Sequence, residues 1–304
     1  MSVRILQIPV SGRDGHRWEL IATLPPRPLA SLLWLPALGV PAKHYQSFAD
    51  ALAEHGVAVF LHEWRGIGSS SLRASRQHDW GYREILLEDL PCSVEALRRH
   101  QDAPTGIIGG HSIGAQFAAC YLGMNPGAFA QLWIVASGSP YWRTFPAPKR
   151  YLFPLAFQLV PWLADRRGLL HGRRLGFAGN EARTLMRDWA RVGLSNRYAA
   201  IGLGHDLEAA LGGIDADIRC VLLRDDWFAP RRSLQALLDK MPRSKPGVTM
   251  LDSAALGGRA DHFGWMKQPQ VVVATLMDPR AQARIEQSGE DLQPRETQVG
   301  HRRD

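Results

Sequence analysis

Short apolar segments alternate with helix-like segments over most of this chain, and this alternation constrains the fold more than any other feature. SLLWLPA, VAVFLHEW, TGIIGG and QLWIVASGS have the length and composition of buried strands. Between them lie AKHYQSFADALAEHG, a segment from about Asp79 to His100 in which Pro91 should kink or break the helix, and a helix from Ile113 onward. Strands that alternate with helices predict an α/β fold with a mostly parallel sheet and helices on both faces.

The two ends of the pattern and its interruption define the predicted organisation. VRILQIPV and HRWELIATL flank the polar turn SGRDG, which predicts a starting hairpin. Residues 140–205 contain no clear buried strand; they hold YLFPLAFQLVPWLA, which prolines interrupt, and the amphipathic helix NEARTLMRDWARV. The alternation resumes at DIRCVLLRDD. We therefore predict a core formed by residues 1–139 and 206–278, a helical cap insertion at 140–205, and a disordered tail at 279–304.

Composition excludes several classes of protein. Hydrophobic residues make up 45% of the chain and charged residues 21%, as in ordinary globular proteins. The three cysteines are far apart, without metal-ligand spacing, which favours buried thiols in a reducing compartment over disulfides or zinc. The sequence shows neither a signal peptide nor an apolar run long enough to cross a membrane. We expect a soluble cytoplasmic protein.

The positive charge is concentrated in one segment. The chain carries a net charge of +7, and residues 140–205 alone hold 11 Lys/Arg against 3 Asp/Glu. A local excess of this kind indicates one basic surface and not a nucleic-acid-binding protein, for which no recognition motif is present. This surface is either a solvated face or an attraction site for an anionic or lipid-like substrate, with contact to a membrane as the weaker alternative.

One serine stands between glycines at the junction of a predicted strand and a predicted helix. In GGHSIGA, Ser112 lies between Gly110 and Gly114. A nucleophile elbow requires a strand, a turn too sharp for side chains on its flanks, and a helix whose N-terminus faces the reacting centre. The pattern therefore predicts Ser112 as a catalytic nucleophile. The alternative is a tight strand–helix contact in which the serine has no chemical role.

A serine hydroxyl needs a base, and in this architecture the acid and the histidine follow the serine in the chain. His262 lies between the last predicted strand and the last helix, whereas His171 and His205 lie in or next to the insertion and His301 lies in the tail. His262 is therefore the predicted general base. The alternative interpretation is a helix-capping or surface histidine.

The acid and the oxyanion donors follow from the same order of elements. Asp225 and Asp226 come directly after the strand CVLL, and the spacing to Pro230 favours Asp226; Asp252 and Asp261 are weaker candidates. The oxyanion needs two N–H donors. We predict the N–H groups of Ile113 and of Leu38. Pro36 has no N–H, so the second donor is Ala37 or Leu38, and we choose Leu38 because Gly39 after it allows close approach of the backbone.

With these motifs the sequence resembles the α/β-hydrolase superfamily over residues 1–278. The resemblance is carried by LPALGV, HEWRGIGSS, GGHSIGA, RDDWFAP and DHFGW. The chain looks most like a bacterial branch of predicted hydrolases similar to serine aminopeptidases and monoacylglycerol lipases. This resemblance implies an eight-stranded α/β-hydrolase fold with a helical cap, and a catalytic triad of Ser112, Asp226 and His262.

The sequence therefore predicts a serine hydrolase, of esterase or lipase type, that cleaves a carboxylic ester, thioester or amide through an acyl-enzyme on Ser112. The expected partner is a small acyl substrate, and no cofactor or metal is expected. One alternative is an acyltransferase with the same triad. The other is a hydrolase-like scaffold that binds a partner without catalysis.

Overall fold

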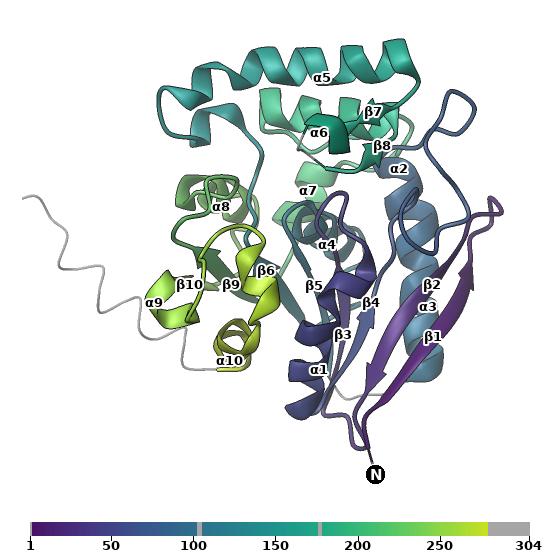
Figure 1. The fold of residues 1–304 in the computed structure, drawn as a ribbon, viewed down its shortest axis with the longest axis vertical. Helices are drawn as coiled ribbons and strands as arrows, with labels where there is room; N and C mark the ends of the chain where they lie inside the picture. The colour runs from purple at the N-terminus through teal and green to yellow at the C-terminus, as the bar shows by residue number, and fades with distance from the viewer. Residues whose placement is uncertain (1, 102–104, 176–177, 279–304) are drawn as a thin grey trace, which may run out of the picture.

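An eight-stranded sheet forms the centre of the computed structural model, which describes residues 2–101, 105–175 and 178–278 (Figure 1). The strand order is β1-β2-β4-β3-β5-β6-β9-β10. The pairs β1–β2 and β2–β4 are antiparallel, and all five remaining pairs are parallel. The predicted starting hairpin and mostly parallel sheet are thus confirmed. The strands are β1 (Arg4–Ser11), β2 (Arg17–Leu24), β3 (Ala30–Leu35), β4 (Val57–Leu61), β5 (Thr105–His111), β6 (Gln131–Val135), β9 (Asp217–Leu223) and β10 (Pro246–Leu251).

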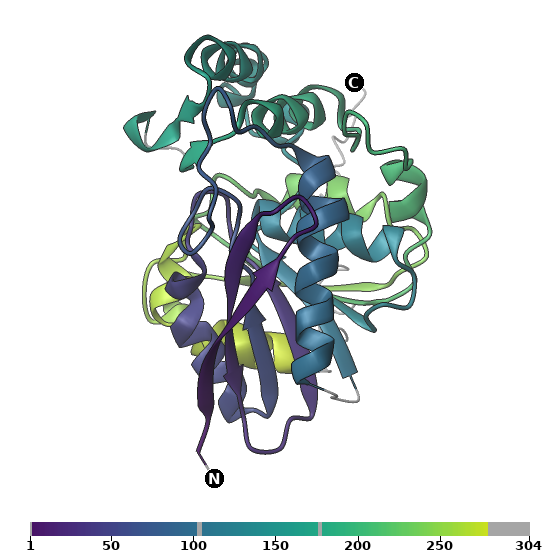
Figure 2. The ribbon, with the colours of Figure 1, turned by 90° about the vertical axis from the view of Figure 1, so that its right-hand side faces the viewer.

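Helices cover both faces of this sheet (Figure 2). The α-helices of the described residues are α1 (Gln46–Glu54), α2 (Tyr82–Glu84), α3 (Leu90–His100), α4 (Ile113–Met124), α5 (Phe153–Arg167), α6 (Arg183–Ser195), α7 (Leu207–Gly212), α8 (Arg231–Leu238), α9 (Ser253–Leu256) and α10 (Gln270–Met277). Short 3₁₀ turns occupy Ala42–Tyr45, Trp142–Thr144, Lys149–Tyr151, Gly172–Leu175 and Gly264–Lys267. The predicted tail at 279–304 lies outside the described residues.

The apolar strands are buried because both of their faces are covered. In β3, Leu33 and Leu35 point into the core under α3 and α4, whereas Leu32 and Trp34 point into the core under α1 and α10. Successive side chains of a strand face opposite sides, so a strand covered on both sides is apolar at every position. This explains the unbroken apolar run that marked β3 in the sequence.

The helix predicted from about Asp79 to His100 is interrupted, although the interruption begins before Pro91. An α-helical turn at Tyr82–Glu84 passes into a π-helical turn at Ile85–Asp89, and the regular helix α3 then starts at Leu90. Pro91 lies in the first turn of α3, directly after the π-helical turn, whose changed hydrogen-bond spacing accommodates a residue without an N–H. The irregularity therefore falls on the turn that precedes the proline.

Residues 140–205, which we call the insertion, lie above one end of the sheet in both views (Figure 1). They contain α5, α6 and two strands that the sequence did not predict, β7 (Leu170–His171) and β8 (Asn180–Glu181), each only two residues long. Helix α5 also continues through Pro161, although its prolines suggested an interrupted segment. The division into core and insertion at these boundaries stays a prediction. No helix in the described ranges is long and apolar enough to cross a membrane.

Candidate active site

Ser112 lies between the end of β5 and the start of α4, in a strained conformation. Its backbone has φ 56° and ψ −127°, a region that residues other than glycine rarely adopt. The turn is held on both sides, since Ser112 N–H donates to Val135 O over 3.1 Å and Ser112 O accepts from Ser137 Oγ at 2.6 Å. The side chain is therefore presented by a sharp turn at the carboxyl end of the central strand.

The glycines on either side of Ser112 are required by the closeness of the surrounding backbone. A Cβ added to Gly110 would lie 2.4 Å from the carbonyl carbon of Gly114. A Cβ on Gly114 would lie 2.1 Å from Leu35 O and 2.5 Å from Pro36 O. Real Cβ atoms do not approach backbone this closely, so the first turn of α4 rests against the end of β3 only because position 114 has no side chain.

The structure pairs His262 with Asp226. The distance between His262 Nδ1 and Asp226 Oδ2 is 2.7 Å, and both residues are buried. The other carboxylate oxygen of Asp226 accepts the N–H groups of Phe228 and Ala229 at 2.8 and 3.2 Å. The carboxylate is thus fixed by the loop after β9, and it can orient the imidazole through Nδ1.

The other candidate acids have different partners. Asp225 is exposed and accepts from Ser253 Oγ, so it does not face the imidazole. Asp252 caps helix α9 by accepting the Ala255 N–H. Asp261 accepts two backbone N–H groups of its own loop. Of these four carboxyl groups, that of Asp226 is the one that contacts the His262 imidazole in the described residues, and its role as the triad acid stays a prediction.

His262 lies against the residue that precedes Ser112. The ring centroids of His111 and His262 are 4.6 Å apart, so the chain segments that carry Ser112 and His262 are in contact. Within the described residues, no hydrogen bond joins the Ser112 hydroxyl to the His262 imidazole. Such bonds are often long before substrate binds. Of the other candidates, His171 is in β7, His205 bonds Leu203 O, and His301 lies outside the described residues.

The loop after β3, which contains Ala37 and Leu38, lies next to the start of α4. The Ala37 N–H donates to Tyr45 Oη over 2.9 Å. Ala37 is therefore not free to donate to a substrate. Among the hydrogen bonds of the described residues, none uses the N–H of Leu38 or of Ile113. The backbone just before Leu38 lies against the first turn of α4, since a Cβ on Gly114 would meet Pro36 O at 2.5 Å, so both N–H groups belong to neighbouring segments.

Two residues of this site had no predicted role, Tyr45 and His111. The Tyr45 hydroxyl lies 2.8 Å from His111 Nδ1 while it accepts the Ala37 N–H. Burial raises the pKa of Tyr45, so the hydroxyl stays protonated and acts as the hydrogen-bond donor to His111 Nδ1. Burial, with a further effect from the His262 imidazole, lowers the pKa of His111 well below its usual value. A neutral tyrosine–histidine pair therefore connects the Leu38 loop to the residue beside Ser112.

Two aromatic side chains pack next to the His262 imidazole. Phe228 and Phe263 have ring centroids 5.0 and 4.8 Å from that of His262. An open pocket in the surface runs past His262, Trp227 and Phe263, and the last two are about half exposed. The pocket beside the buried His262 therefore has aromatic side chains next to the imidazole and charged side chains, among them Arg259 and Lys267, further out.

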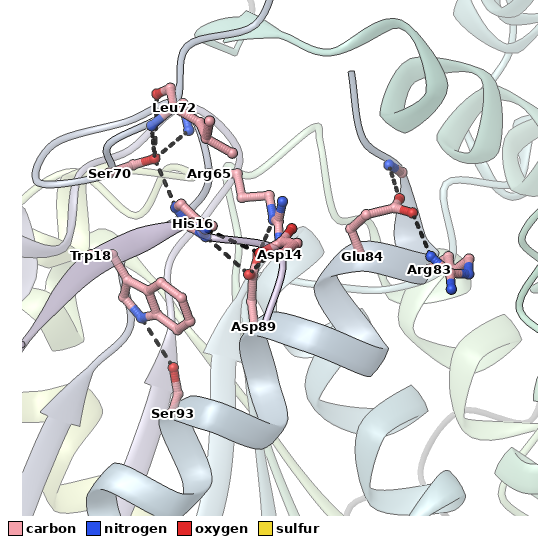
Figure 3. A network of polar contacts seen from close by, with 12 residues as sticks. Asp14, His16, Trp18, Arg65, Ser70, Leu72, Arg83, Glu84, Asp89 and Ser93 are labelled. Atoms are coloured by element: carbon pink, nitrogen blue, oxygen red, sulfur yellow. Dashed lines mark hydrogen bonds and ion pairs between the residues drawn. The ribbon is translucent and has the colours of Figure 1, made fainter. Parts of the chain in front are cut away.

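A second serine, histidine and aspartate meet elsewhere in the molecule, which the sequence did not indicate (Figure 3). His16 Nε2 lies 2.9 Å from Ser70 Oγ, and His16 Nδ1 lies 3.0 Å from Asp89 Oδ1. Arg65 donates to both oxygens of Asp89, at 2.7 and 2.8 Å. Ser70 Oγ also accepts two backbone N–H groups of its own loop, and all four residues are buried.

No group of three or more metal-ligating side chains is placed to hold a metal ion in the part of the chain that the structure describes.

A family comparison matches this chain from residue 26 to residue 194, more than half of its length. The family is described as serine aminopeptidase, S33. The chain belongs to this family. It is a hydrolase of the α/β type. No curated protein matches the sequence.

Solved structures similar to this serine aminopeptidase S33 family member share its fold at low sequence identity. The structure of DcsB in complex with its substrate analogue has a TM-score of 0.60 and 13% identity, covering 96% of this chain and 100% of that one. The α/β hydrolase GrgF from Penicillium sp. sh18 has a TM-score of 0.60 and 14% identity, covering 93% and 99%. An esterase domain from a Rhodothermus marinus protein has a TM-score of 0.55 and 16% identity, covering 95% and 99%.

Proposed function

We propose that the protein is a serine hydrolase that cleaves a carboxylic ester through an acyl-enzyme on Ser112. The observation that carries this proposal is the convergence of three groups at one edge of the sheet. They are a strained serine at the start of a helix, the buried His262–Asp226 pair, and the two backbone donors of Leu38 and Ile113. Each group meets one requirement of acyl transfer.

The proposed reaction begins when His262 accepts the Ser112 proton as Oγ attacks the carbonyl carbon. Asp226 holds Nδ1–H, so that Nε2 is the basic nitrogen. The oxyanion accepts the N–H groups of Ile113 and Leu38, and the proton on His262 then passes to the leaving alcohol. A water molecule, deprotonated by the same imidazole, attacks the acyl-enzyme and releases the acid.

An ester of an apolar acid is the substrate class that the surroundings favour. Three aromatic side chains, those of Trp227, Phe228 and Phe263, line the pocket that includes His262, together with polar groups. Aromatic and apolar walls next to a few polar groups are typical of sites that bind small ligands. One of the similar solved structures is an esterase domain. Thioesters and amides with the same acyl group are further candidates for the same chemistry.

The test is labelling with a fluorophosphonate probe, which reacts only with an activated serine. We expect the wild type and Ser70→Ala to be labelled and Ser112→Ala to remain unlabelled. Ser70 is the matched control, because it also lies within hydrogen-bond distance of a histidine that contacts an aspartate. A folded wild type that resists the probe would contradict catalysis and support the scaffold alternative.

A series of nitrophenyl esters and thioesters of increasing acyl length then measures the substrate preference. We expect kcat/KM to rise with acyl length until the apolar walls are filled, and to be lost throughout in Ser112→Ala. A higher rate with an added alcohol or amine, together with formation of its acyl product, would show an acyltransferase instead.

A further inference from the structure

Helix α5 has an apolar face that points away from the rest of the protein. Leu152, Leu155, Leu159 and Trp162 are 69, 66, 46 and 51% exposed. Because they recur at intervals of three and four residues, they lie along one side of the helix. Both views show α5 as the outermost element above the sheet (Figure 1), so the stripe faces solvent.

This outer stripe is not needed to hold α5 in place. The opposite side of the helix buries Phe157 and Ala164, and Phe157 packs on Trp189 of α6 with ring centroids 4.8 Å apart. Trp162, which is half exposed on the outer side of α5, therefore belongs neither to the candidate active site nor to the core of the insertion. A contiguous exposed apolar surface on a folded protein marks a place of interaction.

Positive charge lies at both ends of the stripe. Lys149 and Arg150 precede the helix, and Arg166 and Arg167 end it. The guanidinium of Arg150 lies 4.9 Å from the ring centroid of Tyr151, and that of Arg166 lies 5.0 Å from that of Trp162. Within α5 the single acidic residue is Asp165, and Arg187 neutralises it over 2.7 Å. The surface is thus apolar along its middle and cationic at its ends.

We propose that α5 is an interfacial helix that seats the protein on an anionic lipid bilayer. Leu152, Leu155 and Leu159 would enter the acyl boundary while the arginines and the lysine bind lipid phosphates. An exposed apolar stripe on an outermost helix, with tryptophan and tyrosine next to arginines, provides the apolar and aromatic groups that anchor proteins at the interface of a membrane. The basic ends add attraction to anionic head groups.

The proposed docking is independent of the proposed catalysis, since none of the four apolar side chains of the stripe belongs to the candidate active site. Lys149 reaches toward that site, with Nζ 5.2 Å from the ring centroid of Trp227, and is left unchanged in the variants below. It also has a consequence for orientation. The insertion contacts the loop after β3, where Gly39 lies against the backbone of Gly179. A protein seated on α5 would therefore hold this end of the sheet toward the lipid.

The experiment measures binding of the full chain to vesicles. One set contains phosphatidylcholine alone, and the other contains phosphatidylcholine mixed with phosphatidylglycerol. We expect sedimentation with the anionic vesicles, little with the neutral ones, and release by added salt. The double variant Leu155→Ser/Trp162→Ser should bind about tenfold more weakly or worse, because two side chains no longer enter the apolar layer. Arg166→Gln/Arg167→Gln should remove part of the dependence on phosphatidylglycerol.

The matched control is Leu29→Ser, which changes a leucine of similar exposure, 67%, between β2 and β3. It should bind vesicles as the wild type does. Hydrolysis of a soluble ester, or probe labelling, should be equal in all variants, which separates docking from catalysis. Absence of binding to anionic vesicles, or equal binding by the α5 double variant, would overturn the proposal. So would a wild-type dimer that the double variant converts to monomer, since the stripe would then bind a second copy of this chain.

Discussion

The two histidine–aspartate pairs of this molecule are similar in geometry and different in everything around them. His262–Asp226 and His16–Asp89 have contact distances of 2.7 and 3.0 Å, and His16 even has a serine within 2.9 Å. In the described part of the chain, however, the Asp226 carboxylate accepts hydrogen bonds from two backbone N–H groups besides contacting the imidazole. Asp89 instead binds a bidentate arginine.

The serines differ as much as the aspartates do. Ser112 stands in a strained turn at the start of a helix, next to two unused N–H donors. Ser70 is buried, and two backbone N–H groups of its own loop donate hydrogen bonds to its Oγ. The comparison teaches that a contact between histidine and aspartate does not by itself indicate catalysis: the proposed triad also has candidate oxyanion donors, and its carboxylate is not neutralised by an arginine that donates to both of its oxygens.

Replacing each histidine in turn by glutamine is the strongest test of this comparison. His262→Gln should lower kcat by roughly a thousandfold or more, since the base is lost. It should lower the free energy of unfolding by only about 1 kcal/mol, because Asp226 loses the imidazole and keeps two backbone N–H partners. His16→Gln should lower the free energy of unfolding by about 2 kcal/mol, because buried partners lose a hydrogen bond, and should leave kcat of the folded protein unchanged. Ester kinetics and urea unfolding of both variants check this. If His16→Gln abolished activity without loss of stability, the two assignments would have to be exchanged.

Removing the arginine tests whether the second pair is structural. Arg65→Met should lower the free energy of unfolding by about 3–5 kcal/mol, because the buried Asp89 carboxylate loses its bidentate partner. The control is Arg83→Met, which removes a surface ion pair with Glu84 and should cost less than about 1 kcal/mol. Urea unfolding at neutral pH measures both. Equal costs would show that Arg65 does not stabilise the buried network.

Glu181 sharpens the comparison, because its buried carboxyl has a backbone N–H as hydrogen-bond partner and no bidentate arginine. Burial raises its pKa from 4.5 to about 7, against a weaker opposing effect of the Gly179 N–H. The folded state therefore binds this proton more tightly than the unfolded state. The stability that depends on it is complete below pH 4.5, falls as the pH rises to about 7, and stays lost above that value.

Glu181→Gln should remove this pH dependence. Relative to the wild type, the variant should gain up to roughly 3 kcal/mol in free energy of unfolding at pH 8 and almost nothing at pH 4.5. Unfolding of both proteins at the two pH values gives the difference directly. A difference that does not change with pH would mean that Glu181 ionises in the folded protein as it does in the unfolded one.

The smallest expected effect is that of replacing Tyr45. Its hydroxyl, and not a carboxylate, is the partner of His111 Nδ1. Tyr45→Phe removes the acceptor of the Ala37 N–H and the donor to His111 Nδ1. We expect kcat to fall about tenfold with KM nearly unchanged, because the loop that carries Leu38 is less well fixed. Tyr82→Phe is the control, since this buried hydroxyl has no hydrogen-bond partner among the described residues. Equal kcat values in the two variants would remove Tyr45 from the site.

Local patterns predicted most of the fold and the position of the serine. The apolar runs of β3 to β6 and the glycines at 110 and 114 express requirements that act within a few residues, so the sequence displays them. Asp226 could be favoured over Asp225 because a proline spacing marked the loop. Tyr45 was not predicted, because its role depends on Ala37 and on His111, which is 66 residues further along the chain. The same holds for His16 and Asp89, 73 residues apart, and for the outward direction of Trp162.

The bare backbone at Gly114 has a consequence for how this protein tolerates mutation. A survey of variants ranked by activity would place positions 110 and 114 beside position 112, although neither carries a reactive atom. One added methyl group at 114 would press on the carbonyls of Leu35 and Pro36 and push two chain segments apart. Such positions are constrained by space that must stay empty, and a list of functional groups alone would overlook them.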